Sequence, residues 1–225
     1  MDQYALSAIG AWNSRQRPDY KLIKVTPINP SIGAEVEGVD LTRPISPELF
    51  AEINTALNEH HAICFRDQKL SDEDHKRFGR MFGKLHTHPG HAARAKAVAA
   101  GDKEAIARAD LYGFGGDPEI LHIKADETSK NVAGEGWHTD VTCDLEPPMG
   151  SMLYIKEIPG QGGGATMFMN MHLAYETLSP TMQKFLEGLT AIHNGAKPYT
   201  GNYGVQVPEG GWPESEHPVV CTHPG

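Results

Sequence analysis

The residues of this chain best suited to chemistry are a histidine and an aspartate two positions apart, His138 and Asp140. They lie in the segment Gly-Trp-His-Thr-Asp-Val-Thr at 136–142, which we expect to form a strand. Side chains two positions apart leave a strand on the same face, so the imidazole and the carboxylate can reach one ion while Thr139 points away. The pair supplies two corners of the facial triad that holds Fe(II) and leaves three coordination positions open. A third ligand must come from elsewhere.

A histidine and an aspartate at this spacing are a weak signal by themselves, because a protein with 12 histidines contains such pairs by chance. One alternative is a surface or capping pair. Another is a zinc hydrolase that combines the pair with a further histidine, although the denser pattern H-E-x-x-H is absent from the sequence. The blocks of sequence around the pair favour the iron site.

These blocks form an ordered set. After the histidine and aspartate come Pro-Pro at 147–148, an apolar run at 151–155, Lys-Glu-Ile-Pro at 156–159, a glycine cluster at 162–164 and Ala-Tyr-Glu-Thr-Leu-Ser at 174–179. Other blocks lie at 32–42, at 65–68 (Phe-Arg-Asp-Gln), at 78–86, at 217–220 (His-Pro-Val-Val) and at 222–224 (Thr-His-Pro). The set resembles the TauD/TfdA family of Fe(II)- and 2-oxoglutarate-dependent dioxygenases, from about residue 22 to the end.

The resemblance implies a fold and an activity. The fold is mainly β with flanking helices, a double-stranded β-helix of the jelly-roll type. The activity is hydroxylation of a small anionic organic substrate, such as a sulfonate, a sulfate ester or an aryloxy or alkyl carboxylate. It consumes O2 and 2-oxoglutarate and releases succinate and CO2. Halogenating relatives carry a small residue in place of the carboxylate, so Asp140 favours a hydroxylase.

The resemblance also assigns roles to four residues. His138 and Asp140 match the iron ligands, and Thr166 matches the threonine that contacts a 2-oxoglutarate carboxylate. His88, in Leu-His-Thr-His-Pro, matches a position at which a histidine contacts the anionic group of the substrate. Without the family context, Thr166 reads as a strand-edge threonine. Trp137 is expected to pack as a wall residue.

The chain departs from the family pattern in two places. The family's distal histidine and its 2-oxoglutarate arginine lie well downstream of the Thr-His-Pro block, and His223 is not the ligand position. We therefore expect the C-terminal part of the domain to lie beyond this chain. The alternative is a truncated or decayed, inactive member that acts only as a binding protein. Gly134 and His91 stand where taurine-type members have asparagine and tyrosine, which argues against taurine itself.

The length of 225 residues fits one domain with a sizeable core. We expect a loose N-terminal arm at 1–20 and a dioxygenase domain at 21–225 with an insertion at 91–118. The insertion is rich in Ala, Lys and Arg. It suits an active-site cover, a contact in a homo-oligomer, or simply an exposed helix.

Charge and cysteine usage narrow the class further. The net charge of −9 argues against nucleic acid and anionic membranes as partners. The three cysteines follow no metal or disulfide spacing, which favours a reduced, cytoplasmic setting. No signal peptide pattern and no apolar run long enough for a membrane span is present.

Periodicity and end signals predict the local elements. Alternating or apolar runs predict strands at 22–27, 33–39, 61–65 and 120–123, besides the one that carries the histidine and aspartate. Ser46 and Pro47 predict the start of a helix that runs to about His60. Ser71 with Asp74 predicts a second helix to about residue 82, and a third is expected at 180–189.

Overall fold

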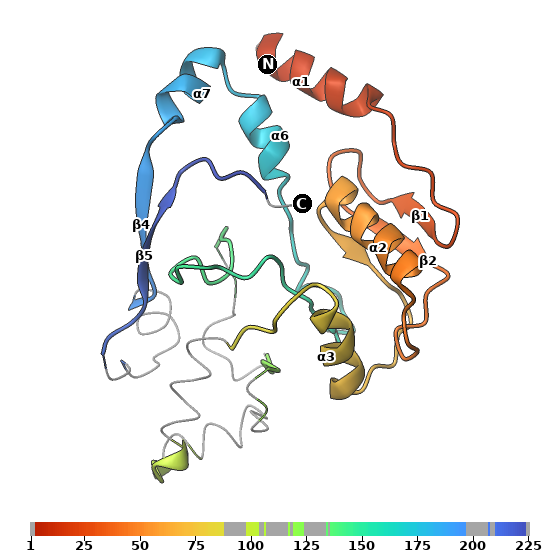
Figure 1. The fold of residues 1–225 in the computed structure, drawn as a ribbon, viewed down its shortest axis with the longest axis vertical. Coiled ribbons are helices and arrows are strands. Elements are labelled where there is room, and N and C mark those ends of the chain that lie inside the picture. The colour runs from red at the N-terminus through yellow and green to blue at the C-terminus, as the bar shows by residue number, and fades with distance from the viewer. Residues whose placement is uncertain are drawn as a thin grey trace. The chain divides into compact units, whose positions relative to one another are not determined.

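The computed structural model describes residues 3–87, 98–103, 106, 117, 119–123, 134, 136–196, 207 and 210–223 (Figure 1). The chain divides into two compact units. Unit 1 comprises residues 1–81, 153–189 and 222–225, and unit 2 comprises residues 82–152 and 190–221. Each unit contains one sheet in the part of the chain described here.

The sheet of unit 1 has the strand order β1-β2-β3. Strands β1 (Lys24–Pro27) and β2 (Ala34–Glu37) are antiparallel, and Gly33 closes their connection with φ 89° and a carbonyl that accepts from Ile28 N at 2.9 Å. Strand β3 (Ile63–Cys64) runs parallel to β2. A parallel pair needs a crossover, and helix α2 (Pro47–His60) provides it.

Helix α2 begins and ends where the sequence predicts. The Ser46 hydroxyl accepts from Leu49 N at 3.2 Å, and Pro47 occupies the first turn, where its missing N–H costs nothing. His61 ends the helix in the left-handed region with φ 61°, and its N–H bonds the Leu57 carbonyl. These local signals fix the length of the crossover.

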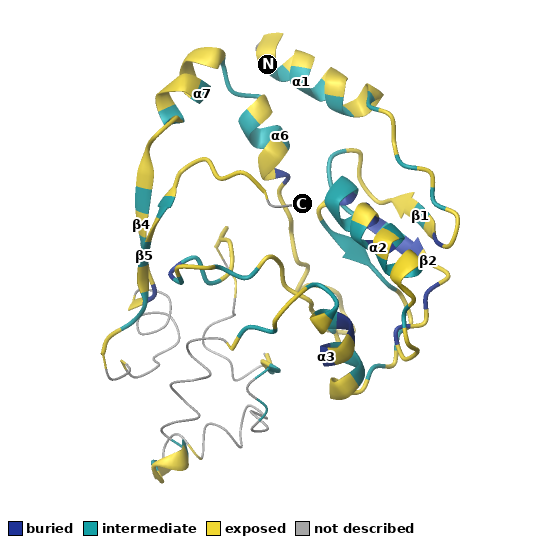
Figure 2. Cartoon of the chain, viewed as in Figure 1, coloured by how far each residue is buried: buried dark blue, intermediate teal, exposed yellow. Residues whose placement is uncertain are grey.

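The core of unit 1 lies between α2 and the sheet (Figure 2). Ile53 and Ala56 on α2 are fully buried, as is Ala34 on β2, and Val36 is 3% exposed. Burying a side chain as large as that of Ile53 or Val36 stabilises the fold by about 1.5–3 kcal/mol. This packing holds the crossover against the strands.

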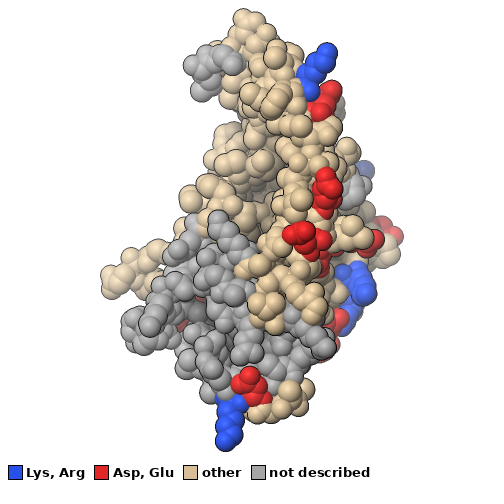
Figure 3. Space-filling view, turned by 90° about the vertical axis from the view of Figure 1, so that its left-hand side faces the viewer, with Lys and Arg blue, Asp and Glu red and all other residues tan. Residues whose placement is uncertain are grey.

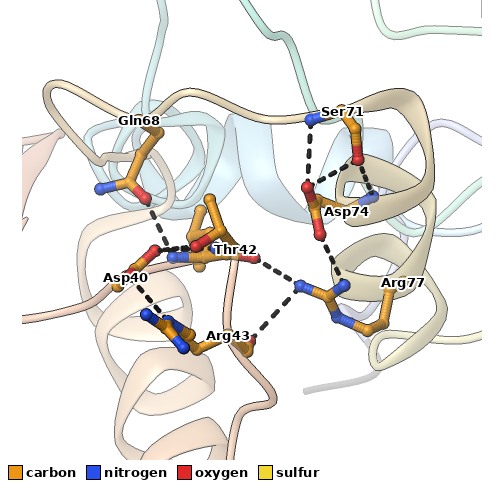
Figure 4. Close-up of polar contacts among 8 residues, drawn as sticks. Asp40, Thr42, Arg43, Gln68, Ser71, Asp74 and Arg77 are labelled. Carbon is orange, nitrogen blue, oxygen red and sulfur yellow. Dashed lines mark hydrogen bonds and ion pairs between the residues drawn. The ribbon is translucent and has the colours of Figure 1, made fainter.

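Helix α3 (Asp72–Arg80) is fastened to the segment after β2 by the polar network in Figure 4. Ser71 and Asp74 form a reciprocal capping box. Arg77 bonds Asp74 Oδ1 at 2.6 Å and the Leu41 carbonyl at 2.8 Å. Hydrogen bonds from Ser71 and Arg77 lower the pKa of Asp74 to about 2. The predicted helix is confirmed, although it ends two residues earlier.

The N-terminal residues correct the expectation of a loose arm. Residues 3–14 form helix α1 (Gln3–Ser14), which contacts helix α6 (Met171–Glu176). The Arg15 guanidinium lies 3.6 Å from the centre of the Trp12 ring and pairs with Glu59 at 2.8 Å. The arginine therefore covers an aromatic ring and binds a carboxylate. The presence of arginine in this segment of the sequence did not by itself indicate this packing role.

Unit 2 holds the antiparallel pair β4 (Thr190–Asn194) and β5 (Glu214–Pro218). The strands predicted at 120–123 and 136–142 are wrong, because these residues form loops and turns where the structure describes them. Helix α7 (Pro180–Leu186) in unit 1 is confirmed but ends before Gly188, whose φ is 75°. Most of the predicted insertion at 91–118 lies outside the described residues.

The described elements mix helix and sheet, and the expected double-stranded β-helix stays a prediction. On the face drawn in Figure 3, acidic side chains spread over the surface, and basic side chains stand apart from one another. None of the described helices is long and apolar enough to span a membrane.

Candidate functional site

The predicted ligands His138 and Asp140 come together in unit 2, but not on a strand. His138 lies in a stretch without regular secondary structure, and Asp140 begins a turn that continues through Cys143. His138 Nε2 lies 3.1 Å from Asp140 Oδ1, and both side chains are about half exposed. Val141 follows with φ 53°, an uncommon conformation for a β-branched residue. The turn supplies the convergence that was expected from strand alternation.

In each side chain, the atom that faces away from the pair (the outer atom, Nδ1 of His138 and Oδ2 of Asp140) is held by a neighbouring residue. His138 Nδ1 lies 2.7 Å from the Gly136 carbonyl, and because a carbonyl only accepts, Nδ1 carries the proton. The Ser151 hydroxyl donates to Asp140 Oδ2 at 2.5 Å. Ligating histidines and carboxylates in metal sites are oriented by contacts of this type. The inner atoms, Nε2 and Oδ1, are left facing each other.

This arrangement suits a cation between the two side chains. With the proton on Nδ1, a neutral imidazole presents a lone pair at Nε2 toward a carboxylate oxygen that also offers lone pairs. A proton or a metal ion relieves that contact. Two donors about 2.1 Å from one ion and at right angles are about 3.0 Å apart, and the observed separation is 3.1 Å. His138 and Asp140 therefore fit as two ligands of a divalent metal.

Among the residues that the structure describes, no third His, Cys, Asp or Glu joins this pair in a metal-binding group. Thr166 is described but belongs to unit 1, where it is exposed in the segment after the glycine cluster. His88 lies outside the described residues. Trp137 is 63% exposed. The roles predicted for Thr166 and His88 remain predictions.

Several polar residues around residues 140–144, hereafter the ligand turn, were not predicted. In the sequence, Ser151 stands at the start of an apolar run, which gives no sign of a polar role. His86 bonds Asp144 at 2.6 Å, and His193 and His217 approach the same turn from β4 and β5. A signal was present in the sequence at 215–217, where Ser and His alternate with Glu as on a strand with a polar buried face.

Comparisons with known proteins identify the family of this chain. The family model described as Taurine catabolism dioxygenase TauD, TfdA family matches residues 24–225. The alpha-ketoglutarate-dependent dioxygenase cnsP of Penicillium expansum is 32% identical over 89% of this chain and 52% of its own length. The alpha-ketoglutarate-dependent sulfonate dioxygenase of Saccharomyces cerevisiae is 30% identical over 90% of this chain and 47% of its own.

A solved structure shows the same fold. The taurine dioxygenase of Burkholderia xenovorans superposes with a TM-score of 0.59 at 28% identity, over 91% of this chain and 60% of that one. The chain belongs to the TauD/TfdA family. It spans about half the length of the two curated relatives described above.

Proposed function

We propose that this chain is part of an Fe(II)- and 2-oxoglutarate-dependent dioxygenase that hydroxylates a small anionic organic substrate, with release of succinate and CO2. The observation that carries the proposal is the contact of His138 Nε2 with Asp140 Oδ1 at 3.1 Å, with the outer atoms of both side chains held by Gly136 and Ser151. Family membership supplies the reaction class.

The residues have separate roles in this proposal. His138 and Asp140 hold the metal, and the bond to the Gly136 carbonyl keeps the ligating nitrogen free of a proton. Thr166 contacts a carboxylate of 2-oxoglutarate. A bound Fe(II) supplies the activation of O2 that is coupled to oxidation of the keto acid. Homo-oligomer formation and a cytoplasmic location belong to the same proposal.

The substrate class rests on an anionic group that His88 recognises. Relatives of this chain are named for a sulfonate, a sulfate ester and 2,4-dichlorophenoxyacetate, all of which carry a negatively charged group.

At Gly134, φ is +83°, and an added Cβ lies 3.5 Å from His138 Cε1, which is ordinary contact. Backbone conformation, more than space, therefore restricts a larger residue at this position.

The test is the variant His138→Ala, with Thr139→Val as the matched control between the two ligands. Removal of the imidazole leaves one of the two described ligands. In the full-length protein, which also supplies the histidine and arginine expected beyond this chain, we expect loss of Fe(II) binding in an anaerobic titration and loss of succinate release. The control should keep both, because Thr139 is exposed. Full iron content and activity in the alanine variant contradict the assignment, and zinc in place of iron in the purified protein favours a hydrolase.

A further inference from the structure

The half-buried face of the β4–β5 ribbon carries three polar side chains beside Ala191. His193 lies opposite Ser215 in the register, and His217 follows two positions later, so the three side chains share one face. This face is half-buried, whereas Ile192 on the other face is 69% exposed. A ribbon that serves only to cover a core places its large aliphatic residues on the inner face. The polar face therefore has another use.

This polar face binds the turn that follows Asp140. Its three contacts fall on three consecutive residues, 142–144. His193 Nδ1 lies 2.9 Å from the threonine hydroxyl at 142, Ser215 Oγ donates to the carbonyl of residue 143 at 2.9 Å, and His217 Nε2 donates to the carbonyl of residue 144 at 3.0 Å. Each residue of the segment is held by a different strand residue.

Three further observations show how firmly the segment is held. His86 Nε2 lies 2.6 Å from Asp144 Oδ2, which adds a contact from the loop before the turn. The rings of His193 and His217 meet edge to face at 5.5 Å, so the two histidines also fix each other. Cys143, in the middle of the segment, is 5% exposed.

The backbone conformation of Val141, which lies between Asp140 and residues 142–144, explains why these contacts are needed. Val141 adopts φ 53°, and its carbonyl accepts from Asp144 N at 3.1 Å. A β-branched residue keeps a left-handed conformation only where its surroundings impose it. Released from the ribbon, Val141 is expected to relax toward negative φ. That relaxation turns Asp140 away from His138.

We propose that His193, Ser215 and His217 are positioning residues that hold the ligand turn so that Asp140 stands beside His138 in the geometry of two adjacent metal ligands. The inference rests on the proposed function for the identity of the metal site. It assigns to the β4–β5 ribbon a role in metal binding that does not involve ligation.

The test uses Co(II) as a spectroscopic probe, in anaerobic titrations of the wild-type protein and of two variants at one position. His217→Leu removes the donor, and His217→Gln keeps a donor at a similar distance. We expect Co(II) binding to weaken by roughly tenfold or more in the leucine variant, as for other residues that orient ligands, with altered visible absorption, and the glutamine variant to recover most of the affinity. Ile192→Thr, on the opposite face, is the control and should bind as the wild type does.

Hydrogen exchange of the 138–144 peptide gives a second measurement, which needs no metal. It should be faster in His217→Leu and in the milder variant Ser215→Ala, and unchanged in Ile192→Thr. Unaltered Co(II) affinity and unaltered exchange in folded His217→Leu overturn the inference. If His217→Leu does not fold, unaltered exchange in Ser215→Ala overturns the inference instead. Failure of the wild type to bind Co(II) through His138, with exchange still dependent on the ribbon, contradicts the proposed function and leaves the ribbon's hold on the turn supported.

Discussion

The two candidate ligands illustrate how much of a metal site is decided outside the ligands themselves. His138 and Asp140 each use one atom for the inner contact and one for a neighbour, Gly136 or Ser151. The neighbour sets which nitrogen of the imidazole is free and which carboxylate oxygen points inward. Substitution of a neighbour therefore tests the site without removing a ligand.

Ser151→Ala removes the hydroxyl that donates to Asp140 Oδ2 at 2.5 Å. The carboxylate is then free to rotate, so we expect Fe(II) affinity to fall by about tenfold, near the lower end for residues that orient ligands. Anaerobic titration measures the change, and Ser179→Ala, at the cap of α7 in unit 1, is the control. Equal affinity in the Ser151 variant and the wild type contradicts the role of the hydroxyl.

Thr166→Val tests the predicted contact with 2-oxoglutarate. The substitution keeps the shape of the side chain and removes its hydroxyl. We expect the binding free energy of 2-oxoglutarate to weaken by about 0.5–1.5 kcal/mol, the usual contribution of one hydrogen bond. The measurement is an anaerobic titration of the metal-loaded protein. An unchanged dissociation constant argues for an exposed threonine with no part in binding.

At the scale of elements, sequence reasoning succeeds where the deciding chemistry is local. Helices α2 and α3 start where predicted because Ser46 and Ser71 cap the residues that directly follow them. The strand expected at 136–142 fails because alternation alone cannot show whether a partner strand is present. The φ of Val141, which makes the turn, is imposed by contacts from distant residues. The closeness of His138 and Asp140 was predictable, but the turn and the contacts that hold them together were not.

The capping box of α3 gives a prediction about acid stability. Hydrogen bonds from Ser71 and Arg77 lower the pKa of Asp74 from 3.8 to about 2. A carboxyl group whose pKa is lower in the folded state stabilises the fold above its unfolded pKa, and this stability is lost as the pH falls toward the folded value. We expect Asp74→Asn to flatten the loss of stability between about pH 4 and pH 2.

Urea unfolding at several acidic pH values measures this contribution. The matched control is Asp72→Asn, in the first turn of the same helix but outside the reciprocal capping pair. The capping box is not the source of the acid sensitivity if both variants lose stability as steeply as the wild type.

At the scale of the whole molecule, charge and histidine burial act in opposite directions on mild acidification. The net charge is −9 at pH 7, so protonation of histidines reduces self-repulsion. Burial, however, lowers the pKa of His60, and partial desolvation with nearby positive charge from His172 and His223 lowers the pKa of His61, whose surface is partly exposed. The folded state thus resists a proton that the unfolded chain accepts.

A group of this kind destabilises the fold as the pH falls below the unfolded pKa of about 6.5, because the unfolded state then binds more protons. We expect the Tm to fall between about pH 7.5 and pH 5.5. His61→Asn, which tolerates the left-handed backbone at that position, should reduce the fall. Thermal unfolding followed by circular dichroism measures it. A Tm that rises on acidification shows that relief of charge repulsion dominates.

The division of the chain into units has a consequence for the order in which the protein is synthesised. Unit 1 is discontinuous, because residues 82–152 of unit 2 separate its first part from residues 153–189. The first part contains β1, β2, α2 and β3 with Ile53 at their centre, so it can bury a core as it leaves the ribosome. Its contacts with residues 153–189, among them those of Tyr154 with the Gln68 carbonyl and of Asn170 with the Ser31 carbonyl, cannot form until residues 82–152 have been synthesised. The segment that carries the candidate metal ligands is therefore synthesised after the first part of unit 1 and before the part that completes it. Unit 1 can be completed only when that whole segment has left the ribosome.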